Sequence, residues 1–530
     1  MMGSMTQDDP TAVRTAPPQG AASSEVTEAP EATGPSTDDA GTADAVAPDA
    51  VAPDDAGVHT DAPSAQRLTV WPVVVLTLCA LAAYVVLSLA RWHRWDTPSW
   101  DNAIFEQGIR GWAGPGWPIV DIKGHEFNQL GDHFSPVIAL LAPFYRLFPG
   151  PQTLLVAQCV LVAISIVPVT VLARRRLGAV WGLLLGIAYA GSWGVQSAID
   201  VQFHEYAFAA PILALGLKAA LEKRWTPACV WIATLLLVKE DMGLTVAGFG
   251  VVLWIWGERR RARWMVAAGL GGMALVLGVI IPLFNPNHQY DYWGRLAEDG
   301  TETALSLGSL LAGAGRLVAN FLVPEQKIST LVLIVVVTAF TALRSPLLLM
   351  IVPTMVWRFA GSTEYYWGPT WHYSLILMPI VFVAAIDGTA MLRESRTATL
   401  RTFGRWAPAL MAAVGVVLLP SFPLADLGRA ATYERAPHVR SGEAALAVIP
   451  AGTSVTTDLG LIVHLTRDHR VYWVGTEGNP ATDYVAIRVD AGWGPDGPTD
   501  ASVYAEQLYP GHTYTLVFDD GGFQVARRDG

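Results

Sequence analysis

The chain has 530 residues, of which 52% are hydrophobic and 15% are charged, and it contains 20 tryptophans. This composition excludes an ordinary soluble domain and indicates a polytopic membrane protein embedded in a lipid bilayer. The formal net charge is −11, and the arginines lie in small clusters between apolar runs. This charge pattern does not indicate a nucleic acid partner.

The first 66 residues differ from the rest of the chain in composition. They are rich in Ala, Pro, Asp, Thr and Gly and contain almost no large aliphatic or aromatic side chains. Such a segment cannot bury enough apolar surface to offset the entropy that it would lose on ordering. Residues 1–66 are therefore predicted to be a disordered cytoplasmic tail.

Apolar segments recur from Leu68 to residue 424. About 20 apolar residues are needed for a helix to cross the hydrocarbon core, so residues 67–424 are predicted to be an α-helical polytopic domain of about eleven transmembrane helices. The spans are predicted at 68–90, 153–173, 177–197, 206–222, 226–239, 242–257, 264–284, 327–343, 346–359, 373–391 and 407–424. Two further segments, 134–148 and 303–323, are interrupted by Pro or Gly and could lie along the membrane surface instead.

Basic residues fall in every second loop, for example at 174–176, 259–263 and 393–405. The excess of Lys and Arg in cytoplasmic loops then predicts a multi-pass protein of the cytoplasmic membrane with its N-terminus in the cytoplasm. The remaining loops, among them a large first loop at 91–152, are predicted to face outward.

The last hundred residues read differently from the apolar segments. "VRSGEAALAVIP" has the pattern of an amphipathic helix, and "TSVTTD", "RVYWVG" and "DYVAIRV" have that of short strands. "YTLVFDDGGFQVARR" reads as a hairpin that turns at Asp520-Gly521. Residues 425–530 are therefore predicted to be a small extracytoplasmic α/β domain.

Polar residues gather in the outward segments of the predicted membrane domain. Ionisable side chains so close to a membrane are expected to face one another and a cavity, which makes them functional candidates. The predicted catalytic residues are Asp101, Asp132, His133, His204 and Glu205. The predicted substrate-binding residues are Gln107, Arg110, Lys239, Glu240, Asp241, Tyr366 and His372.

Two alternative interpretations concern these residues. Asp132 precedes a run with Pro136 near its start, so it could cap the following helix instead of serving catalysis. His125, Asp132, His133, His204 and Glu205 include ligand types that suit a divalent cation, but no helix carries them at a metal-binding spacing. No metal site is therefore predicted, although a divalent cation stays open as a cofactor.

Four quoted stretches carry a family resemblance: "WDNAIFEQGIRGW", "GDHFSPVIALLAPFYRLFPGPQTLLVAQ", "FHEYAFAAPILALGL" and "LLLVKEDMGL". Together with "IPAGTSVTTDLGLIVHLTRDHRVYWV" and "DYVAI", they resemble the prokaryotic membrane-protein family called domain of unknown function 2079, over residues 95–525. That family is similar to the C superfamily of glycosyltransferases (GT-C fold), which take sugars from polyprenyl-phosphate carriers.

The resemblance implies a site and a reaction. The acidic residue that the superfamily carries in its first outward loop matches Asp101, but Asn102 follows where many members have a second acid. The implied partners are a polyprenyl-phosphate sugar donor, the lipid bilayer and a cell-envelope acceptor. Asp101 would accept the proton of the acceptor hydroxyl, and Lys239, His204 or Arg110 would stabilise the departing phosphate.

Two other functions stay open beside a glycosyltransferase. A transporter or lipid flippase would use the same charges to bind its substrate during alternating access, although no internal repeat is evident. A non-catalytic scaffold of the cell envelope would use only its outer domain.

Overall fold

The computed structural model describes residues 69–96, 100–292, 315, 321, 323–361, 363–493 and 497–530. The predicted tail at 1–66 and nearly all of the segment 303–323 lie outside the described residues. Residues 68–530 belong to one compact unit, so the predicted domain boundary near residue 425 stays a prediction.

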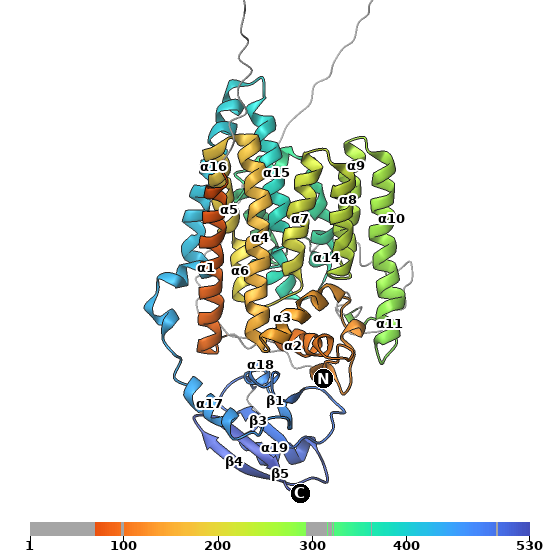
Figure 1. The fold of residues 1–530 in the computed structure, drawn as a ribbon, viewed down its shortest axis with the longest axis vertical. Coiled ribbons are helices and arrows are strands. Elements are labelled where there is room, and N and C mark those ends of the chain that lie inside the picture. Colours follow the sequence, from red (N-terminus) through yellow and green to blue (C-terminus); the bar gives the residue numbers. More distant parts are fainter. Residues whose placement is uncertain are drawn as a thin grey trace, which may run out of the picture. The chain divides into compact units, whose positions relative to one another are not determined.

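Five helical segments in the described part of the chain are long and apolar enough to cross a membrane. They contain α1 (Trp71–Arg94), α4 (Pro151–Leu177), α10 (Arg259–Leu275) with α11 (Ile281–Phe284), α15 (Leu377–Arg393) and α16 (Ala398–Leu418). A π-helical turn at Val276–Ile280 joins α10 to α11. Figure 1 shows α1, α4 and α10 with their axes roughly parallel.

The other predicted spans contain shorter helices. These are α5 (Ala179–Ala190), α7 (Tyr206–Leu221), α8 (Trp225–Ala233), α9 (Met242–Ile255), α13 (Glu325–Val336) and α14 (Val352–Ala360). A helix of 14 residues, such as α9, is about 21 Å long, which is less than the hydrocarbon core of about 30 Å. The predicted count of eleven membrane-spanning helices is therefore not confirmed, although helix occurs at every predicted position.

Burial separates the inner helices from the outer ones. α4 and α15 are largely buried and pack against each other and against α7. By contrast α1, α10 and α16 expose large apolar side chains such as Leu78, Trp264 and Val417. Exposed apolar surface of this extent is expected where a helix faces lipid.

α9 and α10 approach each other closely through a pair of glycines. A Cβ atom on Gly243 would lie 2.4 Å from the carbonyl oxygen of Gly269, and one on Gly269 would lie 2.5 Å from that of Gly243. Only glycine permits this backbone contact, which explains why both positions lack a side chain.

Three short helices lie between the apolar segments: α2 (Trp100–Ala113), α3 (Ala142–Leu147) and α6 (Trp193–Asp200). The segment 134–148 contains a 3₁₀ turn at Pro136–Leu141 followed by α3, and this helical stretch is too short to cross a bilayer. α2 contacts α3 and α4 on one side and α18 (Ile462–Leu465) on the other.

The C-terminal residues form a five-stranded sheet in the order β2-β1-β3-β5-β4. Its strands are β1 (Ser454–Thr457), β2 (Arg470–Trp473), β3 (Tyr484–Arg488), β4 (Tyr514–Asp520) and β5 (Phe523–Arg528). β1 pairs in parallel with β2 and β3, whereas β5 pairs antiparallel with β3 and β4. The predicted helix, strands and hairpin are confirmed, but the turn lies at Gly521-Gly522, one residue later than predicted, because these two glycines supply its positive φ angles.

Both faces of this sheet are covered. α19 (Ala501–Leu508) packs on one face against Val485, Ile487 and Ala526. α17 (Val439–Ala447) and α18 belong to the apolar cluster of the other face, and Ala103 and Ile104 of α2 are part of the same cluster. The core of the C-terminal sheet is therefore completed by residues from the first loop of the membrane domain.

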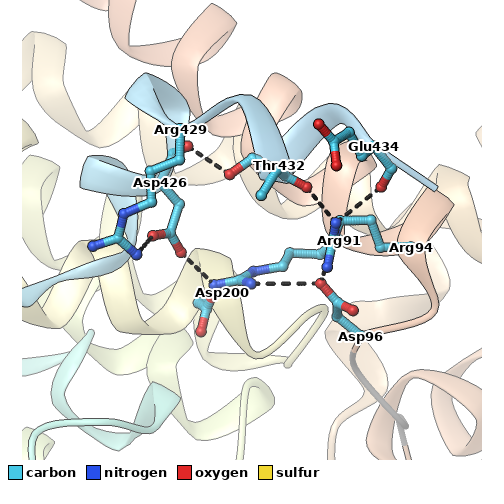
Figure 2. A network of polar contacts seen from close by, with 9 residues as sticks. Arg91, Arg94, Asp96, Asp200, Asp426, Arg429, Thr432 and Glu434 are labelled. Atoms are coloured by element: carbon cyan, nitrogen blue, oxygen red, sulfur yellow. Dashed lines mark hydrogen bonds and ion pairs between the residues drawn. The ribbon is translucent and has the colours of Figure 1, made fainter. Parts of the chain in front are cut away.

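A network of ion pairs and hydrogen bonds stabilises the segment that connects α16 to the C-terminal sheet (Figure 2). Arg91, in the last turn of α1, lies 2.9 Å from a carboxylate oxygen of Asp200 and 2.7 Å from one of Asp426. Arg94 donates to the backbone oxygens of Ala431 and Glu434. One end of α1 thus holds both α6 and the segment that leads to the sheet.

Candidate active site

A cavity of about 660 Å³ collects polar residues from segments that are far apart in the sequence. Its lining comes from α2, the turn at 129–133, the junction of α6 and α7, the turn at 239–241, Tyr290 and Tyr292, α14, Gly361 and the loop at 365–373. Leu459, which follows β1, is also part of the lining. The cavity combines aromatic walls with several charged groups, as ligand pockets commonly do.

His133 and Asp132 each have a charged or polar partner in or beside the cavity. The Nδ1 atom of His133 lies 2.7 Å from Oε1 of Glu240. The Oδ1 atom of Asp132 accepts a hydrogen bond of 2.6 Å from Tyr292 and lies 3.1 Å from the ammonium group of Lys123. Buried charges are tolerated when they are paired in this way.

The proposed helix cap at Asp132 is wrong. The following 3₁₀ turn begins at Pro136 with Ser135 as its N-cap residue, and no side chain caps it. Asp132 instead ends the preceding turn at Gln129–Gly131, and its carboxylate contacts Lys123 and Tyr292.

A buried ion pair lies behind the cavity wall. The Nζ atom of Lys239 lies 2.8 Å from Oε1 of Glu205, and the other carboxylate oxygen lies 2.9 Å from Nδ1 of His204. Glu205 is fully buried and does not line the cavity, whereas Lys239 and His204 do. Glu205 therefore orients the side chains of Lys239 and His204, which line the cavity.

The pKa values of the neighbouring acids Glu240 and Asp241 are shifted in opposite directions. Burial raises the pKa of Asp241 to about 6, although the charge of Lys239 opposes this effect. Burial also raises the pKa of Glu240, but His133 and Lys239 outweigh it and the pKa falls below its usual value. Two adjacent carboxyls with separated pKa values hold different protonation states below about pH 6, where Asp241 can keep its proton while Glu240 is ionised.

Asp101, His204 and His372 meet on one side of the cavity. Each offers one ligand atom, and the three atoms lie within 4.8 Å of one another. The rings of His204 and His372 stack with centroids 3.6 Å apart. A carboxylate and two imidazoles are common ligands of transition metals, but the two stacked rings are too close and too parallel to bind one ion together.

Gln107 and Arg110 lie outside the cavity lining. Gln107 donates to the backbone oxygen of Val471 and accepts from the amide of Ile122. Arg110 donates to the backbone oxygens of Thr466 and His469. Both side chains join α2 to the C-terminal sheet, so the structure does not bring them together with the other predicted binding residues.

Apart from Glu205, which lies behind the wall, the remaining predicted residues line one cavity. They are Asp101, Asp132, His133, His204, Lys239, Glu240, Asp241, Tyr366 and His372. Their roles in catalysis or binding stay predictions, since their positions alone do not test them.

Arg358 is a lining residue that the sequence analysis missed. It is buried in α14, and its guanidinium donates to the backbone oxygens of Tyr366 and Tyr373 and to the hydroxyl of Ser374. No carboxylate forms an ion pair with it among the residues that the structure describes. Its position within the predicted span 346–359 was the available signal, because an arginine inside an apolar run is a functional candidate.

Comparisons with known proteins agree with this fold. No curated protein matches the sequence. The fold is similar to that of a solved structure, ArnT from Cupriavidus metallidurans bound to undecaprenyl phosphate, with a TM-score of 0.50 and 13% identity. The match covers 86% of this chain and 98% of that one, and ArnT has the glycosyltransferase fold of the C superfamily. The model of a family described as predicted membrane proteins, DUF2079, matches residues 93–509, and the chain belongs to that family.

Proposed function

We propose that this protein is a membrane glycosyltransferase that moves a sugar from a polyprenyl-phosphate donor to an acceptor of the cell envelope. The observation that carries the proposal is the single cavity of about 660 Å³ in which Arg358 and Lys239 lie with several carboxylates. The similarity to ArnT bound to undecaprenyl phosphate supports a lipid-phosphate donor. The reaction would take place on the outer face of the cytoplasmic membrane, as the arrangement of the basic loops predicts.

Asp101 is the proposed general base. It lies in the first turn of α2, lines the cavity and forms no ion pair with any residue that the structure describes. A carboxylate that is not neutralised by a neighbour can accept the proton of the acceptor hydroxyl as this oxygen attacks the anomeric carbon. The bond from that carbon to the phosphate oxygen breaks in the same step.

Arg358 is the proposed partner of the phosphate. Lys239 also lines the cavity, but Glu205 already compensates its charge at 2.8 Å. Among the residues that the structure describes, the guanidinium of Arg358 has neutral hydrogen-bond acceptors and no carboxylate partner, so its positive charge is available to the phosphate that leaves. A fixed cation at this place stabilises the developing negative charge of the transition state.

The test is sugar transfer from a labelled polyprenyl-phosphate sugar in proteoliposomes that contain the full-length protein. We expect Asp101→Asn to lower kcat by about 100-fold or more, because general base catalysis contributes about 10²–10⁴-fold. Arg358→Gln should weaken donor binding and lower the rate together. Asp519→Asn, on an exposed position of β4, is the matched control and should transfer at the wild-type rate.

Three outcomes decide between the open functions. Equal transfer by wild type and Asp101→Asn removes Asp101 as the base. Transport of a solute or lipid across the vesicle membrane without sugar transfer favours the transporter or flippase. Binding of envelope material with neither activity favours the scaffold.

A further inference from the structure

We propose that a groove between α9 and α10 binds one anionic phospholipid of the surrounding bilayer. The groove has a volume of about 560 Å³, and every residue of its lining belongs to these two helices. The lining is apolar except for Arg263. The groove shares no residue with the cavity of the candidate active site, and the lipid site does not depend on the proposed function.

Small residues leave space along the seam between the two helices. α9 and α10 pack closely at Gly250, where a Cβ atom would lie 2.6 Å from Cγ2 of Val266. Gly271 lines the groove farther along α10, and a Cβ atom there would meet no other atom within 4 Å. Between Ala262 and Gly271 the helix rises by about 13 Å, at about 1.5 Å per residue. The groove therefore has the length and the apolar surface to hold part of an acyl chain.

Two arginines lie at the end of the groove near the turn that joins α9 to α10. Arg263 lines the groove, and the guanidinium of Arg259 lies 5.6 Å from the ring centroid of Trp254, which is also a lining residue. Residues four positions apart lie on the same side of a helix, so both guanidinium groups can reach one anion. Among the described residues, no carboxylate pairs with either arginine, because Glu258 pairs with Arg261 instead.

This end of the groove also lies where lipid headgroups are expected. The segment that contains α10 is long and apolar enough to cross a membrane, and Arg259 is its first residue. Trp254 and Trp264 are exposed beside the arginines, and tryptophan is enriched at the depth of the headgroups.

The chemistry of the groove selects the class of lipid. Arginine suits a phosphate because its planar guanidinium can donate two parallel hydrogen bonds, and basic pockets between transmembrane helices bind anionic headgroups. A zwitterionic lipid would bring its own ammonium group close to Arg259 and Arg263. A phospholipid with a negative headgroup at the arginines and an acyl chain along the apolar lining fits both parts of the groove.

A second copy of the chain fits the groove less well. Two copies in one membrane share their orientation, so a twofold axis along the membrane normal would bring the same ends of α10 together. Arg259 and Arg263 would then face the arginines of the other copy. The groove lining contains no acid that could compensate these charges.

The groove is also too far from the cavity to present a donor for the proposed sugar transfer. Asp241 lines the cavity and directly precedes α9, whereas the two arginines lie beyond the other end of this helix. The 14 residues of α9 separate these ends by about 21 Å. The occupant is therefore a lipid that binds the protein at a second place.

Native mass spectrometry of the full-length protein in detergent measures the binding, with phosphatidylglycerol and phosphatidylcholine of identical acyl chains as probes. We expect the wild type to retain one phosphatidylglycerol at least tenfold more tightly than phosphatidylcholine. Arg259→Gln combined with Arg263→Gln should weaken phosphatidylglycerol binding about tenfold or more, since each basic residue adds to the attraction of anionic lipid. Arg259→Lys with Arg263→Lys keeps both charges and should keep the preference.

Gly271→Leu tests the apolar part of the groove, because the new side chain would occupy the space of the acyl chain. It should weaken phosphatidylglycerol binding at least tenfold. Gly415→Leu on α16 is the matched control, since a Cβ atom there also meets no other atom within 4 Å. Arg396→Gln with Arg405→Gln removes two exposed arginines near the start of α16 and controls for charge. Both controls should bind phosphatidylglycerol as the wild type does.

Several results would overturn the lipid site. These are equal retention of the two lipids by the wild type, unchanged phosphatidylglycerol binding by a folded Gln or Leu variant of the groove, or equal weakening by the Arg396 and Arg405 control. A wild-type dimer that Gly271→Leu converts to a monomer would assign the groove to a second copy. Tighter binding of polyprenyl phosphate than of phosphatidylglycerol would assign it to the lipid carrier. Lipid binding without sugar transfer by the wild type would contradict the proposed function and leave the lipid site intact.

Discussion

The charged side chains of Glu205 and Lys239 are both buried, and each is stabilised by the other. Glu205 is fully buried and Lys239 is 8% exposed, and their charged atoms lie 2.8 Å apart. Each charge would be unfavourable without the other, because the protein interior screens and solvates charge far less than water does. The pair therefore constrains the geometry of the cavity wall as well as its charge.

We predict that Lys239→Met lowers the free energy of unfolding by about 3–5 kcal/mol, since it leaves the carboxylate of Glu205 without its cation. The double variant Lys239→Met with Glu205→Gln should recover much of this loss. Thermal unfolding in detergent, followed by tryptophan fluorescence, measures both effects.

The exposed pair Arg435 and Glu443 provides the control. Arg435→Met should change the stability by less than about 1 kcal/mol, as is usual for ion pairs at a surface. A double variant that is less stable than Lys239→Met would contradict the assignment of the pair as mutually compensating.

At the scale of elements, α2 is the helix that joins the cavity to the C-terminal sheet. Its residue Glu106 is fully buried, accepts a hydrogen bond of 2.9 Å from Tyr145 near the end of α3 and accepts another from Thr466 after α18. Burial raises the pKa of Glu106 from 4.5 to about 7, although both hydrogen bonds oppose the rise. A single carboxyl thus makes the contact between three elements sensitive to pH.

We predict that this contact weakens as the pH rises. The folded chain holds the proton of Glu106 up to about pH 7, whereas the unfolded chain loses it near pH 4.5, so the stabilisation is complete below pH 4.5 and is lost as the pH approaches 7. Between pH 5 and 8 the wild type should lose on the order of 2–3 kcal/mol relative to Glu106→Gln, which does not titrate. Parallel unfolding titrations of the two proteins measure the difference, and identical pH profiles would contradict it.

At the scale of the whole molecule, the C-terminal sheet and the first loop of the membrane domain share one apolar core. Val120 and Ile122 are fully buried in the same cluster as Val455 of β1 and Ala486 of β3. Arg470 of β2 adds an ion pair with Asp121 at 2.8 Å. Residues 425–530 therefore do not complete their own core.

We predict that Ile122→Ala destabilises the sheet although Ile122 lies far from it in the sequence. Removing a fully buried isoleucine side chain to Ala typically lowers the free energy of unfolding by about 2–5 kcal/mol. Amide hydrogen exchange should become faster in β1 and β3 as well as in the loop around residue 122. Ile328→Ala, at an exposed position of α13, is the control. Faster exchange in the loop alone would indicate that the sheet folds independently.

The sequence by itself determined the class of fold and the positions of the helices, because apolar runs and strand patterns are local properties of the chain. It also determined which loops carry ionisable residues. It did not determine how many helices reach across the bilayer, because short helices such as α9 can be covered by neighbours that only the tertiary structure defines.

The tertiary structure alone decided which polar residues meet. Gln107 and Arg110 follow Asp101 on the same helix, yet they contact the C-terminal sheet, because a helix of 14 residues presents different faces to different neighbours. Arg358 and His372 enter the cavity beside His204, more than 150 positions away along the chain. Contacts between such distant segments depend on the packing of the whole bundle, which no local pattern of residues encodes.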